Sequence, residues 1–252
     1  MQKRFKSKTV LVTGGAGGIG AAICRRFANE GGHVWVLDSN GEGSNELVRS
    51  IRNMGGQADS QILGLTDRSA IYNCIEYIIS LGHNIDVVCN NAGINRRGTL
   101  MELTESDWSL SFKVNLDAIF HMCQAVIPHM KYQGGGAIVN TASQWGLHPV
   151  PGHIAYNTTK AAVAAFTQNL ARDYAPDKIR VNAVCPGEVR TPMLESNLIR
   201  TGRTLEDLNA LVPYGRIGEP DEVAALIAFL ASDEAGYLCG SLIEITGAQA
   251  VN

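Results

Sequence analysis

One stretch, Thr13-Gly14-Gly15-Ala16-Gly17-Gly18-Ile19-Gly20, decides the fold of this 252-residue chain. It follows the apolar residues 9–12 and precedes a helical pattern that begins at Ala21. A strand that turns through glycines into a helix directs backbone N–H groups and the positive end of the helix dipole at one point. That arrangement binds a pyrophosphate, and the glycines let the backbone approach the phosphates closely. Glycine-rich turns are common, so the pattern needs support from elsewhere in the chain.

Asp38 gives the first support for a dinucleotide site. It ends a second apolar run, residues 33–37, and lies 18 residues beyond Gly20. An acidic residue at this distance accepts hydrogen bonds from the adenosine ribose hydroxyls and repels a 2′-phosphate. No arginine or lysine lies within residues 13–20 or directly after Asp38 to offset that repulsion. We therefore expect NAD rather than NADP, although an aspartate here can also serve only as a helix cap.

Composition excludes several classes of protein. Hydrophobic residues make up 45% of the chain and charged residues 18%, which is enough for a substantial core. The net charge of −3 argues against a nucleic-acid surface, and no apolar run approaches the roughly 18–20 residues that cross a bilayer. The basic first eight residues lead directly into a strand instead of a signal core, so a cytoplasmic location is expected. None of the six cysteines forms a C-x-x-C pair, and we expect no metal site.

Strand-like and helix-like segments alternate along the whole chain. This alternation predicts an α/β protein, a three-layer doubly wound Rossmann fold with a seven-stranded parallel sheet in a single domain over residues 1–252. Continuously apolar runs are typical of buried parallel strands. The expected strands are residues 8–13, 33–38, 58–65, 85–90, 136–142, 178–184 and 242–246. The expected helices are residues 17–30, 41–55, 68–82, 104–131 (with Pro128 disturbing its last turns), 153–175 and 220–231.

Residues 188–219 break this alternation. Proline and glycine punctuate the segment, and a short helical pattern lies between them. An insertion at this place, between the sixth strand and the last helix, is often a substrate loop or lid, and otherwise a plain surface loop. We interpret it as a lid.

Tyr156 and Lys160 are candidate catalytic residues. Their spacing of four places both side chains on one face of the helix, one turn apart. A fixed ammonium next to a phenol favours the phenolate, so we expect the pKa of Tyr156 to fall toward neutrality and Tyr156 to act as general acid/base. Ser143 ends the fifth strand, where the ligand crevice of such sheets lies, and its hydroxyl can hold the substrate oxygen beside the phenol. Most Tyr-x-x-x-Lys pairs are ordinary helix surface, and serine often only opens a loop.

Taken together, these motifs resemble those of the short-chain dehydrogenase/reductase family over nearly the whole chain. Residues 13–20 match the family's T-G-x-x-x-G-x-G, and residues 90–93 match its N-N-A-G. Tyr156 and Lys160 match its Y-x-x-x-K, with Ser143 at the usual spacing. Asn115 lies where the family places its fourth catalytic residue, and residues 186–193 match the segment that closes over nicotinamide.

The resemblance implies roles for these residues. Tyr156 is expected to be the acid/base, Ser143 the partner of the substrate oxygen, and Lys160 the ligand of the nicotinamide ribose. Asn115 is expected to kink its helix through a water that links Lys160 to solvent. The residues expected to contact NAD, besides Tyr156 and Lys160, are Gly14, Gly17, Gly18, Ile19, Asp38, Leu65, Asn91, Ala92, Gly93, Pro186, Gly187, Val189 and Thr191.

Gly64 departs from the family pattern. The family usually has an aspartate at this place, which contacts the adenine amino group. Glycine lacks that side chain, and only the backbone of Leu65 remains to make the contact. We expect a modest loss of NAD affinity and no change of cofactor.

The substrate is the least constrained part of the prediction. The candidate pocket residues are polar and include several cations, which favours a small hydrophilic alcohol such as a sugar, polyol, hydroxy acid or hydroxysulfonate. Exposed arginine and histidine usually face only water. The candidates are Arg97, Gln144, Trp145, His153, Glu188 and Arg190, with Arg96 also near the mouth.

Three functions stay open. The chain is expected to be an NAD-dependent oxidoreductase that interconverts a secondary alcohol and a ketone. The enzymatic alternative is a 3-oxoacyl-thioester reductase, and the non-enzymatic one is an NAD-binding redox sensor. The resemblance also implies a homotetramer, formed through the long helices near residues 104–131 and 153–175 and through the last strand.

Overall fold

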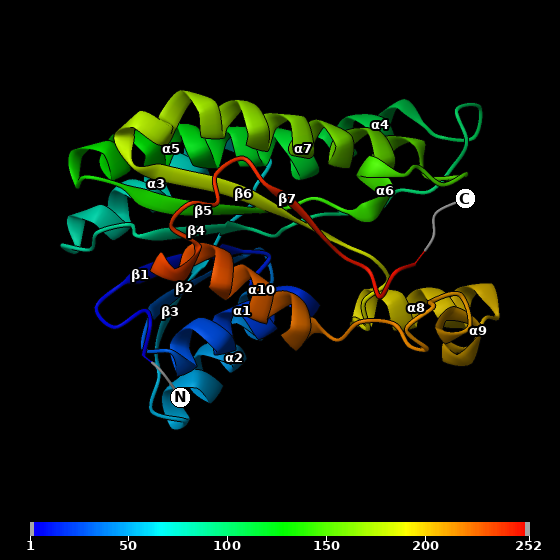
Figure 1. The fold of residues 1–252 in the computed structure, drawn as a ribbon, viewed down its shortest axis with the longest axis horizontal. Coiled ribbons are helices and arrows are strands. Elements are labelled where there is room, and N and C mark those ends of the chain that lie inside the picture. The colour runs from blue at the N-terminus through cyan, green and yellow to red at the C-terminus, as the bar shows by residue number, and fades with distance from the viewer. Residues whose placement is uncertain (1–2, 250–252) are drawn as a thin grey trace.

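The computed structural model describes residues 3–249 and contains one seven-stranded parallel sheet. The strand order is β3-β2-β1-β4-β5-β6-β7, and the order reverses between β1 and β4 (Figure 1). This order is the doubly wound arrangement that the alternation of elements predicts. The strands are β1 (Thr9–Thr13), β2 (His33–Asp38), β3 (Gln57–Ile62), β4 (Val87–Asn90), β5 (Gly136–Thr141), β6 (Ile179–Pro186) and β7 (Leu242–Ile245).

Helices cover both faces of the sheet and separate its core into two halves. One half packs α1, α2 and α10 against the sheet, and the other packs α3, α5 and α7 (Figure 1). Successive side chains of β1 pack into opposite halves of the core, with Val10 and Val12 in one half and Leu11 in the other. The long helices are α1 (Gly18–Asn29), α2 (Gly41–Asn53), α3 (Arg68–Ser80), α5 (Ala118–Tyr132), α7 (Ile154–Tyr174) and α10 (Pro220–Ala231).

The helix expected at residues 104–131 is divided into three parts. It consists of α4 (Glu105–Phe112), a π-helical segment at Lys113–Asp117, and α5. The wider π turn contains Asn115, which is fully buried. Pro128 lies inside α5, which continues to Tyr132. A proline removes one helical hydrogen bond, and the buried Ile127 and Met130 on either side hold the turn against the core.

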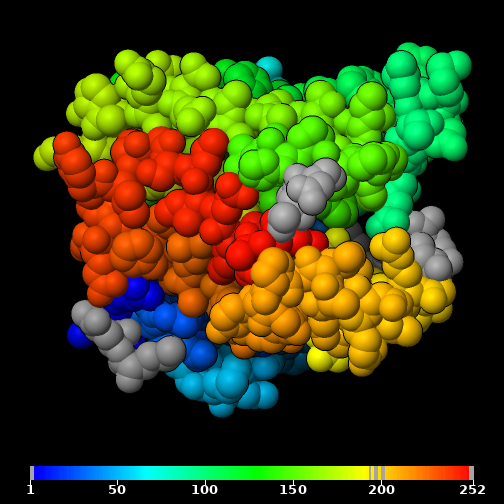
Figure 2. All heavy atoms as spheres, turned by 45° about the vertical axis from the view of Figure 1, so that its right-hand side comes forward, coloured from blue at the N-terminus to red at the C-terminus, as the bar shows by residue number. Residues whose placement is uncertain are grey.

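The expected lid contains two short helices, α8 (Pro192–Thr201) and α9 (Leu205–Asn209). They lie side by side beyond the carboxyl ends of the strands (Figure 1). A small apolar cluster of their own, made by Leu198, Leu208, Val212 and Ile217, holds them together. In the space-filling view of Figure 2 they form the yellow and orange mass below the green surface that includes α6 (Gln144–Leu147).

A chain of buried polar side chains joins β4, β5 and α7, and we call it the polar ladder. Asn90 Nδ2 donates to Asn140 Oδ1 at 2.9 Å, and Asn140 Nδ2 donates to Thr167 Oγ1 at 2.9 Å. Thr167 in turn donates to the Val163 carbonyl at 2.8 Å. All three side chains are at most 1% exposed, so each bond forms where water cannot replace it.

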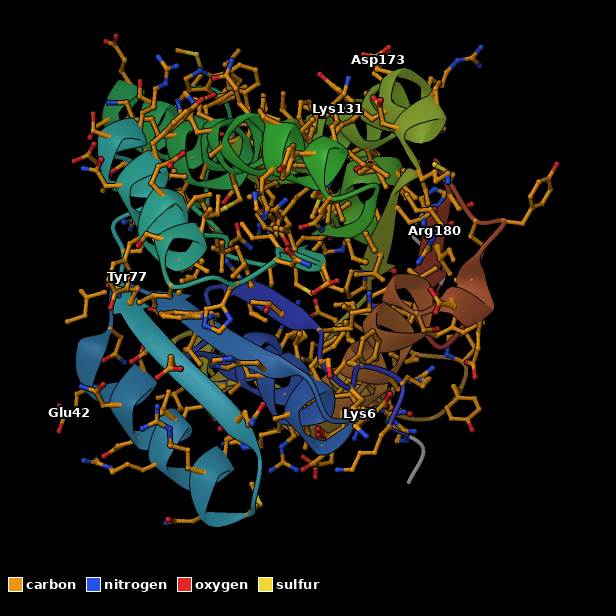
Figure 3. All side chains as sticks on the ribbon, turned by 90° about the vertical axis from the view of Figure 1, so that its left-hand side faces the viewer. Lys6, Glu42, Tyr77, Lys131, Asp173 and Arg180 are labelled. Atoms are coloured by element: carbon orange, nitrogen blue, oxygen red, sulfur yellow. The ribbon has the colours of Figure 1, made fainter. Side chains whose placement is uncertain are left out.

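Arg180 joins β6 to the end of α10, at the side of the molecule shown in Figure 3. Its guanidinium donates to the carbonyls of Leu230, Ala231, Ser232 and Ala235 at 2.6–3.1 Å. The last carbonyls of a helix have no partner within the helix, and a cation there complements the helix dipole. A strand residue therefore caps α10 and fixes it to the sheet.

None of the helices in the described part of the chain combines the length and the apolar character that crossing a bilayer requires.

Candidate active site

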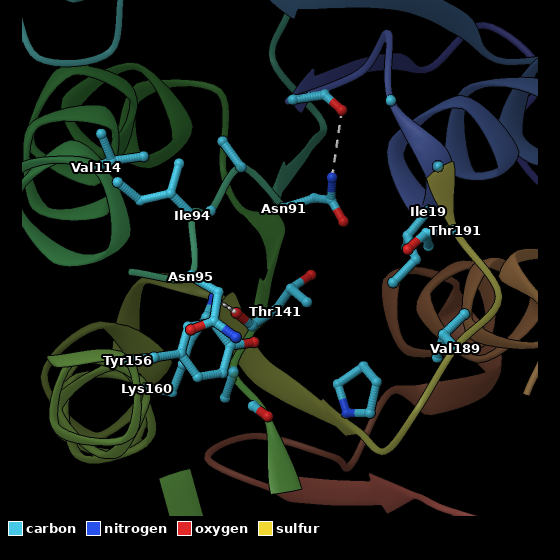
Figure 4. A pocket seen from close by; sticks show the side chains of 18 of the residues that line it. Ile19, Asn91, Ile94, Asn95, Val114, Thr141, Tyr156, Lys160, Val189 and Thr191 are labelled. Carbon is cyan, nitrogen blue, oxygen red and sulfur yellow. Dashed lines mark hydrogen bonds between the residues drawn. The ribbon is translucent and has the colours of Figure 1, made fainter. Parts of the chain in front are cut away.

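A cavity of about 880 Å³ lies at the carboxyl ends of the strands, where the order of the sheet reverses. Its walls come from the glycine turn, the ends of β2, β4, β5 and β6, helix α7 and the segment expected to be a lid. Figure 4 shows Tyr156 and Lys160 on one side of this cavity and Ile19, Val189 and Thr191 on the other. Parallel sheets bind ligands at this point because the loops on either side of the reversal diverge.

The glycine turn is built for a close approach of backbone to ligand. Gly14 has a φ of +63°, and a Cβ on it would lie 2.9 Å from the Ala92 Cα. A Cβ on Gly20 would lie 2.0 Å from the Gly14 carbonyl oxygen, so neither position accepts another residue. The turn delivers Gly17 and Gly18, where α1 begins, to the cavity wall. This helix N-terminus fits the pyrophosphate of a dinucleotide.

Asp38 is held in the cavity wall by two backbone amides. Its Oδ2 accepts from Ala16 N at 3.0 Å, and its Oδ1 accepts from Asn40 N at 2.9 Å. The carboxylate therefore has a fixed position next to the glycine turn. Arg97 and Lys160 are the only arginine or lysine among the described residues that line the cavity, and neither belongs to the turn or to β2.

Asn91, Ala92 and Gly93 lie against the glycine turn. Thr13 Oγ1 accepts from the amides of Asn91 and Ala92 at 3.1 and 3.2 Å, and Asn91 Nδ2 donates to the Thr13 and Gly14 carbonyls at 3.3 and 3.4 Å. These bonds join β1 and β4 across the reversal point. The three residues line the cavity as expected for the adenosine side of the site.

Ser143 and Tyr156 meet in one wall of the cavity. Ser143 follows β5 and caps α6, with its Oγ accepting from Trp145 N at 3.1 Å. The Ser143 side chain lowers the pKa of the Tyr156 phenol, whereas burial raises it. The serine and the phenol come from different elements, and both face the cavity.

The pKa of Tyr156 is raised, which contradicts the expectation that Lys160 depresses it. Burial is the largest cause, and the negative charge of Glu188 adds to it. The Lys160 ammonium lies 5.8 Å from the centre of the phenol ring. Burial also lowers the pKa of Lys160, to about 8, so this lysine loses its proton before the phenol does. Above about pH 8 the amine is neutral and no longer favours the phenolate, so the effect of burial prevails.

Lys160 is 2% exposed and points toward the same wall as Tyr156 (Figure 4). Its Nζ donates to the Thr141 carbonyl at 2.7 Å. Gly93 makes room for it, since a Cβ there would lie 3.3 Å from Lys160 Nζ and 3.4 Å from Asn115 Oδ1. The lysine is thus held between the end of β5 and the segment after β4.

Asn115 uses its buried amide to hold the segment after β4. Its Oδ1 accepts from Ile94 N at 2.8 Å, and its Nδ2 donates to the Ile94 carbonyl at 2.9 Å and to Thr159 Oγ1 at 3.0 Å. Asn115 lies in the π-helical segment, where its helix departs from regular α-helical geometry. These direct bonds place the asparagine beside Lys160, the neighbour of Thr159.

The segment expected over the nicotinamide also lines the cavity. Pro186, Gly187, Val189 and Thr191 all contribute to the wall, and so does Leu65 on the adenosine side. Thr191 caps α8 by accepting from Leu194 N at 3.2 Å. The segment expected to be a lid therefore begins at the cavity wall.

The six substrate candidates divide into two groups. Arg97, Gln144, Trp145 and Glu188 line the cavity, whereas His153 and Arg190 do not. His153 turns its Nδ1 to Asn95 Oδ1 at 3.0 Å and packs on the Trp145 ring, so it supports the wall from behind. Arg190 donates to Glu195 at 3.1 Å on the exposed side of the lid.

Some lining residues were not among the sequence candidates. Asn95 follows the N-N-A-G motif by two residues, and Leu194 projects from α8. Their positions depend on how the lid and the loop after β4 fold back over the sheet. Asn95 could have been included because it continues the segment that carries the motif.

Comparison with known proteins agrees with this geometry. The family model described as short chain dehydrogenase matches residues 8–200. This chain is a short-chain dehydrogenase. The chain is 40% identical to the 3-oxoacyl-[acyl-carrier-protein] reductase of Thermotoga maritima over 244 residues, covering 97% of this chain and 98% of that relative. It is 35% identical to a cyclopentanol dehydrogenase of Comamonas testosteroni over 249 residues, covering 99% of both.

Solved structures give the same assignment. The L-sorbose reductase from Gluconobacter frateurii, complexed with NADPH and L-sorbose, superposes with a TM-score of 0.94 at 28% identity and full coverage of both chains. As a short-chain dehydrogenase, the protein is an oxidoreductase that acts on alcohol and ketone groups with a nicotinamide cofactor.

Proposed function

We propose that this short-chain dehydrogenase uses NAD to interconvert a secondary alcohol and a ketone on a small polar substrate. The observation that carries the proposal is the meeting of Ser143, Tyr156 and Lys160 in the wall of a cavity that begins at the glycine turn. When bound, the oxidised nicotinamide supplies the hydride acceptor and a positive charge beside the phenol.

Tyr156 is the acid/base of this proposal. Ser143 holds the substrate oxygen against the phenol, which takes the hydroxyl proton in oxidation and returns it in reduction. The Ser143 side chain opposes the rise in the pKa of Tyr156 that burial causes. Lys160 binds the ribose hydroxyls of the cofactor and, while protonated, favours the phenolate.

NAD is proposed over NADP on the strength of Asp38. The carboxylate is fixed by two amides, and a 2′-phosphate beside it would meet a negative charge with no cation from the glycine turn. The neighbour from Gluconobacter binds NADPH, so the preference needs a direct test. We expect NAD⁺ to bind more tightly than NADP⁺ in calorimetric titrations. Tighter binding of NADP⁺ would reject this part of the proposal.

The acid/base role is tested with Tyr156→Phe. General acid/base catalysis contributes about 100-fold to 10,000-fold, so we expect a loss of that order in kcat for NADH formation with an alcohol panel. NADH binding, measured by its fluorescence, should remain. Tyr132→Phe is the matched control, because Tyr132 is 91% exposed at the end of α5. Equal rates for wild type and Tyr156→Phe would refute the assignment.

A 3-oxoacyl-thioester reductase is the second candidate, favoured by the 40% identity to the Thermotoga enzyme. It predicts rapid reduction of an acetoacetyl thioester, with little turnover of free polar alcohols. A redox sensor without turnover has no use for a serine, phenol and ammonium around one cavity, and the Tyr156→Phe comparison also tests it.

We also propose a homotetramer in the cytoplasm. Trp108 on α4 and Phe120 on α5 are large side chains with 36% and 45% exposure, and β7 is an edge strand of the sheet. The small residues 161–165 of α7 allow another helix to pack closely. Light scattering coupled to size exclusion should give four times the mass of 27.0 kDa. A monomer mass would reject this assembly.

A further inference from the structure

Glu188 is a carboxylate in the cavity wall that the proposed acid/base chemistry does not use. It directly follows Gly187, where the chain leaves β6. Its own backbone is fixed, because the Glu188 carbonyl accepts from Gly218 N at 2.9 Å. The next residue, Val189, forms a bridge with Gly218. The side chain therefore projects from a rigid base at the point where the lid begins.

The titratable groups that interact with Glu188 come from three separate parts of the chain. Arg97 lies in the loop after β4, Arg203 lies between α8 and α9, and Tyr156 lies on α7. Burial raises the pKa of Glu188, while the two arginines act in the opposite direction and favour the carboxylate. In the part of the chain that the structure describes, no hydrogen bond or ion pair engages its oxygens. A largely desolvated carboxylate of this kind needs a donor.

The surrounding wall suits a small hydroxylated molecule. The Trp145 ring stands edge-on to Tyr156 with centres 6.0 Å apart and packs on His153 at 4.6 Å. Asn95 is held by His153. The wall thus combines a rigid aromatic surface, which contacts C–H groups, with polar side chains that are fixed before substrate binds.

We propose that Glu188 accepts a hydrogen bond from a second hydroxyl of the substrate, next to the carbon that Tyr156 serves. The substrate class is then a vicinal polyol or sugar, and a simple alcohol is a poor substrate. The inference rests on the proposed function. A cationic group is the other donor that a carboxylate attracts, but the charges of Arg97 and Arg203 oppose it.

The test compares substrates that differ by one hydroxyl. The pairs are butane-2,3-diol against butan-2-ol, and cyclopentane-1,2-diol against cyclopentanol, each with NAD⁺. A site built for a hydroxyl rejects the analogue without it, so wild type should prefer each diol by about tenfold or more in kcat/KM. Glu188→Leu should abolish this preference by raising KM for the diols more than KM for the mono-alcohols, with the rates compared on the plateau of each pH profile. Glu188→Gln keeps one weaker acceptor, so its diol preference should lie between that of wild type and that of Glu188→Leu.

A second readout separates substrate binding from a structural role. Glu188 raises the pKa of Tyr156, and Ser143 lowers it. Glu188→Gln should therefore move the acidic limb of the pH–rate profile for alcohol oxidation to lower pH. Glu206→Gln is the matched control, because Glu206 is exposed on α9 and lies outside the cavity wall. It should change neither the diol preference nor the pH profile.

The results can show separately whether the role of Glu188 fails and whether the proposed dehydrogenase function fails. NADH binding by each variant shows whether that variant is folded. If Glu188→Leu is not folded, Glu188→Gln is used for the comparison in its place. Wild type that prefers mono-alcohols, or a folded Glu188 variant that keeps the full diol preference, overturns the role of Glu188 alone. The absence of Tyr156-dependent turnover with every alcohol overturns the proposed function itself.

Discussion

Replacement of Lys160 with methionine should leave the protein at least as stable as wild type at neutral pH while removing a proposed catalytic group. The lysine is 2% exposed, and burial lowers its pKa from 10.5 to about 8. At about 1.4 kcal/mol per pKa unit, keeping this ammonium charged inside the protein costs about 3 kcal/mol at pH 7. Methionine is of similar length and carries no charge, so it avoids this cost.

The sign of the pH dependence follows from proton binding. Between about pH 8 and pH 10.5 the unfolded chain holds the lysine proton and the native protein has released it, so native stability rises with pH in this window. Loss of the bond from Lys160 to the Thr141 carbonyl costs the variant about 1–3 kcal/mol at every pH. The stability of the variant relative to wild type should therefore fall by about 3 kcal/mol from pH 7 to pH 10.5.

The assay is urea denaturation of both proteins at closely spaced pH values, followed by tryptophan fluorescence at one protein concentration. Groups that do not interact with Lys160 titrate equally in the two proteins and cancel in the difference, whereas Cys185 interacts with Lys160 and is replaced by alanine in both proteins. A stability difference that stays constant across the range would refute the reasoning, as would a variant that gains on wild type at higher pH.

Three further changes test other parts of the site. Asn115→Leu removes three buried hydrogen bonds to Ile94 and Thr159 and should cost about 2–4 kcal/mol of stability, seen as a lower urea midpoint. An unchanged midpoint would show that the π-helical segment does not need these hydrogen bonds. Gly64→Asp should tighten NAD⁺ binding modestly in calorimetry, since nothing lies within 4 Å of a Cβ there; no gain would exclude an adenine contact at this position. Asp38→Ser should narrow the gap between NAD⁺ and NADP⁺ affinity, and a widened gap would contradict the charge argument.

The fold could be predicted from the sequence because its signals are local. The apolar runs that became β1, β2 and β5, and the periodic segments that became α1 and α7, each carry their own pattern. The division at Lys113–Asp117 could not be predicted in this way. It depends on the Asn115 amide reaching the Ile94 backbone, a contact between segments 21 residues apart.

Where a motif fixes the backbone, the predicted residues line the cavity, and where neighbours set the direction of a side chain, the sequence did not predict its place. His153 lies close to Tyr156 in sequence, but its contacts with Asn95 and Trp145 hold its ring outside the cavity lining. Whether the pKa of Tyr156 rises or falls depends on how far the effect of burial exceeds that of the neighbouring ammonium. The spacing of two residues along a helix does not reveal how deeply they are buried.

The polar ladder constrains how the reacting groups sit relative to one another. Ser143 follows the strand that carries Asn140, and Tyr156 lies on the helix that carries Thr167. A hydrocarbon contact between strand and helix tolerates a small slide, but a slide of one residue, about 1.5 Å along the helix axis, breaks a 2.9 Å bond between amide and hydroxyl. Substitutions among the surrounding aliphatic side chains can therefore accumulate without changing the distance between Ser143 and Tyr156.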